Sequence, residues 1–340
     1  MLQIETQGSW REMGGQIGET FRERFRPMLE HFASWLAGDL DAYRPAIGVI
    51  RRTLAERCPE LNEETLGMGE AAGLEPDLML GLRFFNELRS YTTGCSGAFV
   101  ADAPEGPLLA RTCDIEPDLG QEIQLCRVNR PDGGPQTITM TYLGMSGGVG
   151  VNEHGLAMAG SSAPAEARAT TDGVPMAVGD FLLLNRCRSA REAHALLSGL
   201  KMRGKAAVQL ICDASGDSFL VELASGYAPV FAPRTEGKTW QACSNFCFSG
   251  RIPSRRDPRL MENAYARYGR MAHLLDSGPM EHSLSGMKQL VADIAQPGPV
   301  CHEPQCWFRT AYAFVVETRS RRMHLCPGHP AESKYFEVSL

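Results

Sequence analysis

The spacing of apolar residues changes several times along the chain, and each change predicts a new kind of element. In the first 94 residues, apolar positions recur mostly every three or four residues, which predicts helices. From residue 95 to 162, short apolar or alternating stretches lie between turns that contain glycine and proline, which predicts strands. Further along, the same patterns predict helices over 175–200 and 258–295, strands over 207–212, 218–223, 310–318 and 322–325, a strand leading to residue 243 and an edge strand over 335–338.

The order of these elements indicates the fold class. The predicted strands come in hairpin runs, and the helices come in blocks between them. This order does not fit a doubly wound parallel sheet, in which single strands and helices alternate. We therefore expect an α+β protein with two antiparallel sheets packed face to face and helical layers outside. Residues 1–94 form a mostly helical N-terminal segment, and residues 95–340 form the core.

Composition and charge narrow the class of protein. Of the 340 residues, 43% are hydrophobic and 22% are charged, as in globular proteins with a sizeable core. The net charge is −6 and no block of like charges occurs, so we expect neither nucleic-acid binding nor a basic membrane patch. No apolar run reaches about 18 residues, so no membrane span is expected. The N-terminus lacks the pattern of a signal peptide, and we expect a cytoplasmic protein.

The 11 cysteines are odd in number and scattered along the chain, unlike the framework of a small disulfide-rich domain. Most of them are expected to be reduced and buried. The spacings closest to a metal site are Cys243-x3-Cys247 and Cys301-His302-x3-Cys306. Neither has a second, properly spaced pair beside it, so no metal site is expected.

A glycine-rich stretch over 147–160 resembles a phosphate-binding loop only superficially. It lacks the Gly-Lys-Ser/Thr ending of a P-loop, and the residues after it predict a strand where a dinucleotide site requires a helix. We interpret it as a strand, an Asn-Glu-His-Gly turn and a second strand. No nucleotide or other organic cofactor is expected.

A predicted hairpin brings three reactive side chains together. Two short strands lie on either side of the turn 102–106, which contains proline and glycine. Antiparallel pairing across this turn places Cys95 opposite Cys113. Cross-strand neighbours are about 5 Å apart, so side chains at this end of the hairpin are close to one another. Arg111 and Asp114 then lie close to Cys95. A thiol, a guanidinium and a carboxylate at one end of a hairpin predict a nucleophile site.

The same residues resemble a known family. A Gly94-Cys95 junction followed by Arg and Asp sixteen and nineteen residues after the cysteine resembles the choloylglycine hydrolase and acyl-CoA:6-aminopenicillanate acyltransferase group of N-terminal nucleophile (Ntn) hydrolases. The Asn-Glu-Leu segment over 86–88 and the Gly-x-Asn-x-x-Gly-Leu hairpin over 150–156 are also similar to that group. The resemblance covers essentially the whole chain and implies a four-layer αββα sandwich.

The resemblance also implies self-cleavage between Gly94 and Cys95. Residues 1–94 are then a propeptide or small subunit, and residues 95–340 are the Ntn-hydrolase core. A thiol has a pKa near 8.5, whereas a free α-amino group titrates near 7.7–8.0 and is a suitable base at neutral pH. Cleavage therefore places nucleophile and base on one residue, and no separate histidine is needed.

Roles for three charged residues follow from the resemblance. Asp114 is expected to hold the amine of Cys95, and Arg111 to lower the pKa of its thiol and position the substrate. Arg309 begins a late predicted strand, as an arginine of the family does, and is a further expected site residue.

The resemblance places the oxyanion donors in two other segments. The chain just beyond the 150–156 hairpin supplies one donor in relatives, which by position corresponds to Ser162 and Ala163. Asn245 lies in a Ser-Asn-Phe segment that is similar to a Thr-Asn-His-Phe segment of the acyltransferase, where the asparagine donates to the oxyanion. Phe246 replaces the histidine of that segment, which leaves the donor role intact but changes the pocket.

We therefore expect a Cys95 enzyme that transfers an acyl group from an amide or thioester, such as acyl-CoA, to an amine or water. The alternatives are a simple amidase of the bile-salt or penicillin V type, or an unprocessed family member that binds without catalysis. The expected partners are a small-molecule acyl donor and acceptor. The expected assembly is a heterodimer of the self-cleaved fragments or a homo-oligomer.

Overall fold

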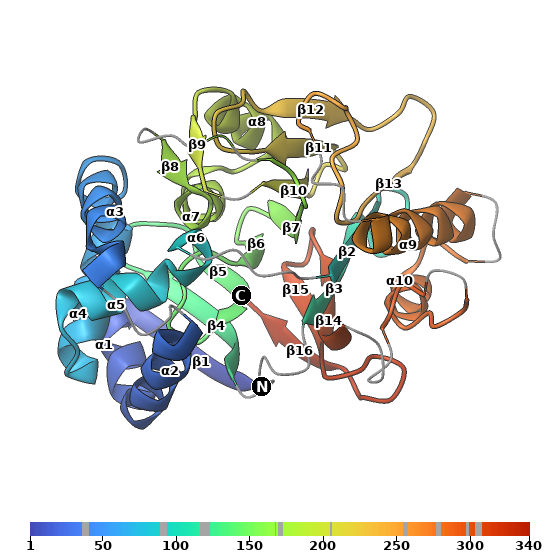
Figure 1. The fold of residues 1–340 in the computed structure, drawn as a ribbon. Helices are drawn as coiled ribbons and strands as arrows, with labels where there is room; N and C mark the ends of the chain where they lie inside the picture. The colour runs from blue at the N-terminus through green and yellow to red at the C-terminus, as the bar shows by residue number, and fades with distance from the viewer. Residues whose placement is uncertain are drawn as a thin grey trace.

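The computed structural model describes residues 1–35, 41–88, 94–115, 123–166, 168, 173–204, 206–253, 258–276, 280–296, 299–302 and 308–340. They form two large β-sheets, one of eight strands and one of six, which pack face to face between helices (Figure 1). A short parallel ribbon of β8 (Val174–Pro175) and β9 (Met202–Arg203) lies outside both sheets. The four-layer α+β sandwich expected from the sequence is confirmed.

The six-stranded sheet contains the predicted hairpin. Its order is β13-β2-β3-β14-β15-β16, and all neighbouring strands are antiparallel. The strands are β2 (Gly94–Val100), β3 (Leu108–Ile115), β13 (Trp240–Cys243), β14 (Arg309–Glu317), β15 (Arg322–Pro327) and β16 (Phe336–Ser339). Cys95 pairs with Cys113, in the register predicted from the turn between β2 and β3.

The eight-stranded sheet has the order β1-β4-β5-β6-β7-β10-β11-β12. Its strands are β1 (Leu2–Gly8), β4 (Gln124–Pro131), β5 (Thr137–Tyr142), β6 (Val149–Asn152), β7 (Ala157–Ser162), β10 (Ala207–Cys212), β11 (Ser218–Leu223) and β12 (Val230–Pro233). Its pairs are antiparallel except β1 and β4, which run parallel along the whole of β1. A parallel pair requires a long connection, and the N-terminal helices lie within this one. β1 therefore joins the mostly helical N-terminal segment to the core sheet.

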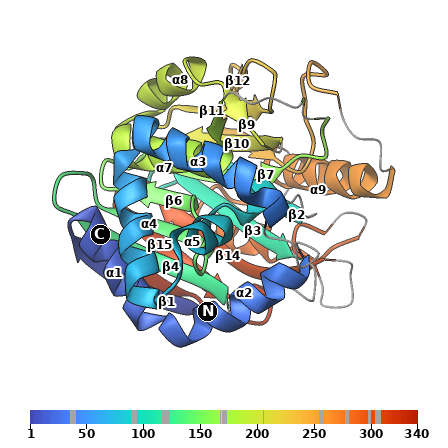
Figure 2. The ribbon, with the colours of Figure 1, turned by 60° about the vertical axis from the view of Figure 1, so that its left-hand side comes forward.

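Helices cover the outer face of each sheet. They are α1 (Trp10–Thr20), α2 (Arg22–Trp35), α3 (Arg44–Arg57), α4 (Pro59–Ala72), α5 (Pro76–Arg83), α6 (Phe85–Leu88), α7 (Met176–Arg186), α8 (Ala190–Ser198), α9 (Pro258–Asp276) and α10 (Leu284–Val291), with a 3₁₀ turn over Asp41–Tyr43. α9 and α10 pack on the six-stranded sheet, and the helix predicted over 258–295 is thus two helices. The N-terminal helices lie with α7 and α8 on the side of the eight-stranded sheet (Figure 2).

The core strands are apolar on both faces because both faces are covered. On β3, Leu109 points toward the other sheet, where it joins Phe99 and Leu210 in the core between the sheets. Its neighbours Leu108 and Ala110 point the other way and pack beneath α9 and α10. A strand buried on both sides carries apolar residues at consecutive positions, as Leu108, Leu109 and Ala110 do here.

The glycine-rich opening of the chain allows two helices to touch backbone to backbone. A Cβ atom on Gly14 of α1 would lie 2.0 Å from the carbonyl oxygen of Glu64 on α4. A Cβ atom on Gly67 of α4 would lie 2.0 Å from the carbonyl oxygen of Arg11. No side chain fits at such distances, so these two glycines set the close crossing of α1 and α4.

A buried charge cluster fixes the N-terminal segment to the core. Glu64 on α4 forms ion pairs with Arg83 on α5 and with Arg127 on β4, and all three side chains are less than one-tenth exposed. Burial raises the pKa of Glu64, but the two guanidinium groups lower it more, to below its usual value. Removing one partner of such a cluster typically costs about 3–5 kcal/mol. The segment 1–94 is thus held to the core by backbone pairing and by buried charge.

Candidate active site

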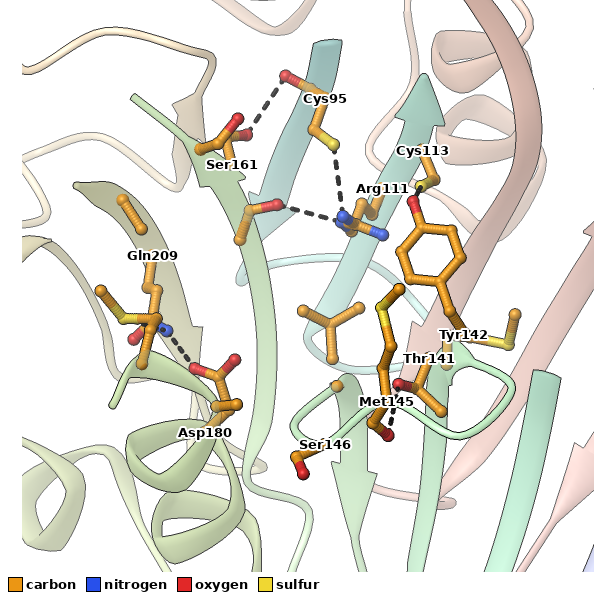
Figure 3. A pocket seen from close by; sticks show the side chains of 18 of the residues that line it. Cys95, Arg111, Cys113, Thr141, Tyr142, Met145, Ser146, Ser161, Asp180 and Gln209 are labelled. Atoms are coloured by element: carbon orange, nitrogen blue, oxygen red, sulfur yellow. Dashed lines mark hydrogen bonds between the residues drawn. The ribbon is translucent and has the colours of Figure 1, made fainter. Parts of the chain in front are cut away.

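Cys95 lies at the bottom of a cavity that reaches between the sheets. It is the second residue of β2, and its side chain faces the core between the sheets together with Phe99. The residue is only 3% exposed, and its thiol lines a cavity of about 150 Å³ (Figure 3). A small reactant can therefore reach the sulfur through this cavity.

Arg111 connects the thiol to both sheets. It lies two residues before Cys113 on β3, so the two side chains share a face of the strand. Its guanidinium donates from Nη2 to Cys95 Sγ at 3.3 Å (Figure 3). It also donates from Nη1 to Tyr312 Oη at 2.7 Å and from Nε to the carbonyl oxygen of Gly160 on β7 at 3.1 Å. Three hydrogen bonds hold the cation in place beside the sulfur.

Cys95 and Cys113, here called the thiol pair, behave as one titrating unit. The hydrogen bond between the thiols raises the pKa of Cys95, burial raises it further, and Arg111 opposes both. The same hydrogen bond lowers the pKa of Cys113 to about 6, burial opposes this, and Arg111 lowers it again. Tyr142 Oη lies 3.7 Å from Cys113 Sγ. The shared hydrogen bond and Arg111 thus favour a thiolate in the pair, and its titration belongs to both residues together.

A β-bulge aims Tyr312 into the cavity. On β14, Thr310 pairs with Asp114 and Tyr312 pairs with Cys113, so Ala311 is an extra residue without a partner on β3. Without the bulge, Tyr312 would point to the opposite face of the sheet, because side chains alternate along a strand. With it, the phenol reaches Arg111.

The backbone of Cys95 is held by three side chains from other elements. Its N–H donates to Asn245 Oδ1 at 2.8 Å. Its carbonyl oxygen accepts hydrogen bonds from Arg267 NH1 at 2.6 Å and from Ser161 Oγ at 3.2 Å. Arg267, on α9, is almost fully buried and also donates to Asn245 Oδ1 at 2.7 Å. The peptide unit on each side of Cys95 is therefore fixed.

Asp114 lies on the face of β3 opposite the thiol pair. It is fully buried and pairs in register with Gly94, beside the bond that precedes Cys95. It accepts a hydrogen bond from Thr310 Oγ1 at 2.7 Å, and His302 Nε2 is 3.8 Å from its carboxylate. Burial lowers the pKa of His302, which favours the neutral imidazole. Asp114 therefore lies beside Gly94, on the face of β3 away from the Cys95 sulfur.

Of the other three predicted site residues, one lines the cavity and two do not. Ser162 lines the cavity, and its carbonyl oxygen accepts a hydrogen bond from Asn245 Nδ2 at 2.7 Å. The backbone N–H of Ala163 donates to the carbonyl oxygen of Ala206 at 3.0 Å. Arg309 is half-buried at the start of β14, pairs in register with Ile115 and does not line the cavity. The roles of these three residues remain predictions.

The walls of the cavity are largely apolar and its far side is polar. The apolar walls are Met140, Met145, Val149 and Met176. Asp180 and Gln209, which hydrogen-bond to each other, lie across the cavity from the thiol pair (Figure 3). Methionine side chains are flexible and polarisable, so walls of this kind adapt to differently shaped apolar groups.

The cavity passes through the eight-stranded sheet where two strands separate. β6 and β7 pair only at Gly150 with Met158 and at Val151 with Ala157. Beyond these pairs, Gly160 of β7 lines the cavity, as do residues of α7 on the outer side of the sheet. The opening therefore connects the thiol pair with the helical layer.

A second cavity, of about 500 Å³, lies between β10–β13 and α9. Aromatic side chains line much of it: Trp240, Phe246, Phe248, Tyr265 and Tyr268. It contains none of the predicted catalytic side chains, so the smaller cavity around the thiol pair is the candidate active site despite its size.

No group of three or more His, Cys, Asp and Glu side chains suited to a metal ion occurs in the described part of the chain. Cys306, the last residue of one metal-like spacing, lies outside the described residues. Among the described helices, none is long and apolar enough to cross a membrane.

Three contributors to the site carry no clear sequence signal. Arg267 sits in a helix whose sequence shows only amphipathic spacing, and it reaches Cys95 through the tertiary fold. Tyr142 ends β5, and only the packing of the two sheets brings it to Cys113. Tyr312 follows the predicted Arg309 closely in sequence, but its orientation depends on the bulge.

Two stacked sheets between helical layers, with a cysteine as the second residue of a central strand, form an Ntn-hydrolase type of sandwich. Residues 102–332, more than half of the chain, match the family described as acyl-coenzyme A:6-aminopenicillanic acid acyl-transferase. The chain belongs to this family, and the protein is an enzyme of the Ntn class. The match begins after Cys95, so the choice of nucleophile depends on the geometry of the site.

Solved structures were compared with this fold. Penicillin V acylase from Agrobacterium tumefaciens is 14% identical, with a TM-score of 0.50, over 72% of this chain and 86% of that one. A mutant of conjugated bile acid hydrolase from Clostridium perfringens is 12% identical, with a TM-score of 0.47, over 72% of this chain and 92% of that one. No curated protein sequence matches the chain. At 14% identity, the similarity to penicillin V acylase supports the architecture alone.

Proposed function

We propose that this enzyme is activated by self-cleavage and that Cys95 carries an acyl group from a donor to an acceptor. The donor is an amide or a thioester such as acyl-CoA, and the acceptor is an amine or water. One observation supports this most: the Cys95 sulfur lies in the cavity 3.3 Å from the Arg111 guanidinium, while Asn245 holds the backbone nitrogen of the same residue. Nucleophile and future amine are thus presented by one fixed residue.

In the cleavage step, Cys95 Sγ attacks the carbonyl carbon of Gly94. The C–N bond breaks as the nitrogen takes a proton, which leaves a thioester, and water then hydrolyses the thioester to a Gly94 carboxylate and a free Cys95 thiol. A Cβ atom on Gly94 would lie 3.2 Å from Asp114 Oδ2 and 3.4 Å from the Phe308 ring. Glycine thus leaves room at the carbon that is attacked.

In turnover, the new α-amino group of Cys95 takes the thiol proton as the sulfur attacks the acyl carbon of the donor. The leaving amine or thiol receives that proton, and an acyl thioester remains on Cys95. The acceptor, an amine or water, then gives a proton to the same amino group and attacks the thioester, which returns the thiol. The buried Asp114 carboxylate stabilises the ammonium form of the amino group between these steps.

Donors from two segments are assigned to the tetrahedral oxyanion. Asn245 is assigned as one donor, as the resemblance implies, and its Nδ2 lies 2.7 Å from the carbonyl oxygen and 3.5 Å from Oγ of Ser162, which lines the cavity. Ser162 and the neighbouring backbone at Ala163 are the second donor segment. Arg309 begins β14 and does not line the cavity, and it is assigned to the substrate only as the resemblance implies.

The acyl group is expected to be apolar. Methionine and valine side chains surround the path from the thiol pair to the outer side of the sheet, and a cavity of about 150 Å³ accepts a small or slender group. The partners in the reaction are therefore small molecules.

Replacing Arg111 by glutamine is expected to move the acid limb of the kcat/KM profile to higher pH. The guanidinium lowers the pKa of both thiols, so its loss leaves less thiolate at neutral pH, about tenfold for each unit of displacement. Arg111→Lys is the control, because it keeps the charge but loses the planar fork to Gly160 and Tyr312, and it should lower kcat with a smaller change of the limb. If the acid limb of the kcat/KM profile stays at the wild-type pH in a folded Arg111→Gln protein, Arg111 does not lower the pKa of the thiols.

Pure protein is expected to separate into two fragments on a denaturing gel and to elute as one species on native size exclusion. The larger fragment should begin with Cys95 on N-terminal sequencing. The β1–β4 pairing and the Glu64–Arg127 ion pair are expected to hold the two fragments together. A full-length chain that is fully active would contradict the proposal.

A further inference from the structure

The backbone hydrogen bonds of Cys95 show which of the two types of antiparallel residue pair Cys95 and Cys113 form. In an antiparallel ladder, a residue directs both its N–H and its C=O either toward the partner strand or away from it. The N–H of Cys95 donates to Asn245, and its C=O accepts from Arg267 and Ser161, so both groups point away from β3. Cys95 and Cys113 therefore form a non-hydrogen-bonded pair, the closer of the two types.

This pair type has the spacing that a disulfide requires. Directly opposed residues in a non-hydrogen-bonded pair have Cα atoms about 4.5 Å apart and side chains on the same face. A disulfide usually joins Cα atoms about 4.4–6.8 Å apart. Both residues are free thiols in the structure. An S–S bond between them therefore requires side-chain rotation and little movement of the strands.

The thiol pair is also the reactive one among the described cysteines. Burial raises the pKa of distant thiols, to about 12 for Cys126 and about 12 for Cys301. In the thiol pair, the shared hydrogen bond and Arg111 favour an anion near neutral pH. Both members line the cavity, so a small oxidant that enters meets a thiolate beside a second thiol.

We propose that Cys95 and Cys113 form a reversible disulfide that switches the enzyme off under oxidising conditions, with hydrogen peroxide or another hydroperoxide as the oxidant. The loss of activity rests on the proposed function, whereas formation of the bond does not. A thiolate of the pair attacks one peroxide oxygen, the O–O bond breaks, and a sulfenic acid and hydroxide form. The second thiol attacks the sulfenic sulfur, the S–S bond forms, and water leaves.

The reaction balances as two thiols and one peroxide giving one disulfide and two waters. Both sulfurs are oxidised and the peroxide is reduced by two electrons. A dithiol reductant reverses the step and restores both thiols. Besides switching the enzyme off, the disulfide protects Cys95, because a sulfenic acid captured by Cys113 does not proceed to the irreversible sulfinic acid.

The test treats the full cleaved protein with a small molar excess of hydrogen peroxide, blocks remaining thiols with iodoacetamide and maps the peptides by mass. A linked Cys95–Cys113 peptide pair, lighter by two hydrogens, is expected, with loss of turnover that dithiothreitol restores. In Cys113→Ser, Cys95 should instead carry added oxygen atoms, and dithiothreitol should restore much less of the activity. Cys126→Ala, a buried cysteine on β4, is the matched control and should behave like the wild type.

Two outcomes would overturn the proposal and are distinguishable. If Cys95 is over-oxidised in the wild type without a linked peptide, and wild type and Cys113→Ser lose activity alike, the disulfide is wrong while the nucleophile stands. If the linked peptide forms quantitatively and turnover persists, the switch is wrong and so is the assignment of Cys95 as the nucleophile. Circular dichroism of Cys113→Ser before oxidation establishes that this variant is folded.

Discussion

Cys95→Ala is expected to remain one full-length chain and to lose turnover by at least about 10⁴-fold, since removing the nucleophile of a covalent mechanism costs at least that much. Two separate losses arise from one substitution. Without the sulfur, nothing attacks the Gly94 carbonyl, so the chain stays intact, and no acyl thioester can form. Gel analysis under denaturing conditions and a substrate assay on the same preparation measure both.

Cys126→Ala is the matched control for this prediction. It removes a different buried thiol, which lies on β4 and outside the cavity. The variant is expected to yield two fragments and near-normal turnover. A Cys95→Ala protein that is cleaved like the wild type would place the cleavage chemistry elsewhere. A Cys95→Ala protein that remains active would remove Cys95 from the mechanism.

Asn245→Ala is expected to lower kcat by about 10²–10³-fold, the usual cost of removing one oxyanion donor. The substitution also removes the acceptor for the Cys95 N–H and for Arg267 NH2, so a second variant is needed to separate the two effects. Asn245→Asp keeps an acceptor oxygen and loses the N–H donors.

Both Asn245 variants are expected to lose kcat with a smaller change in KM, because an oxyanion forms only in the transition state. Single-turnover kinetics with an activated N-acyl substrate measure this. A folded, cleaved Asn245→Asp protein with wild-type kcat would contradict the donor role. The same kcat accompanied by a raised KM would make Asn245 a substrate-binding residue instead.

The parts of the fold that depend on local chemistry could be predicted from the sequence. The turn between β2 and β3 is short and contains proline and glycine, so it sets the register that pairs Cys95 with Cys113. The strands predicted over 207–212 and 218–223 coincide with β10 and β11, because a tight turn joins two apolar runs. Hairpins are predictable because their partners are neighbours in the chain.

The parts that depend on long-range contacts could not be predicted. β1 pairs with a strand more than 100 residues away, and its short sequence gives no hint of the partner. Arg267 reaches Cys95 from α9, and no local pattern marks it among the other arginines. The predicted hairpin brings Asp114 close to Cys95 in the chain register, but the alternation of side chains puts it on the opposite face from the thiols. The bulge at Ala311 likewise redirects Tyr312 by a single residue.

Intact-mass spectrometry of the wild-type protein, before and shortly after mixing with a panel of acyl-CoA and N-acyl amine substrates, tests the central claim most directly. The account predicts two chains with the masses of residues 1–94 and 95–340. It also predicts a transient acyl adduct on the larger chain, which peptide mapping places on Cys95. An uncleaved chain that turns over substrate, or an adduct on any other residue, would contradict it.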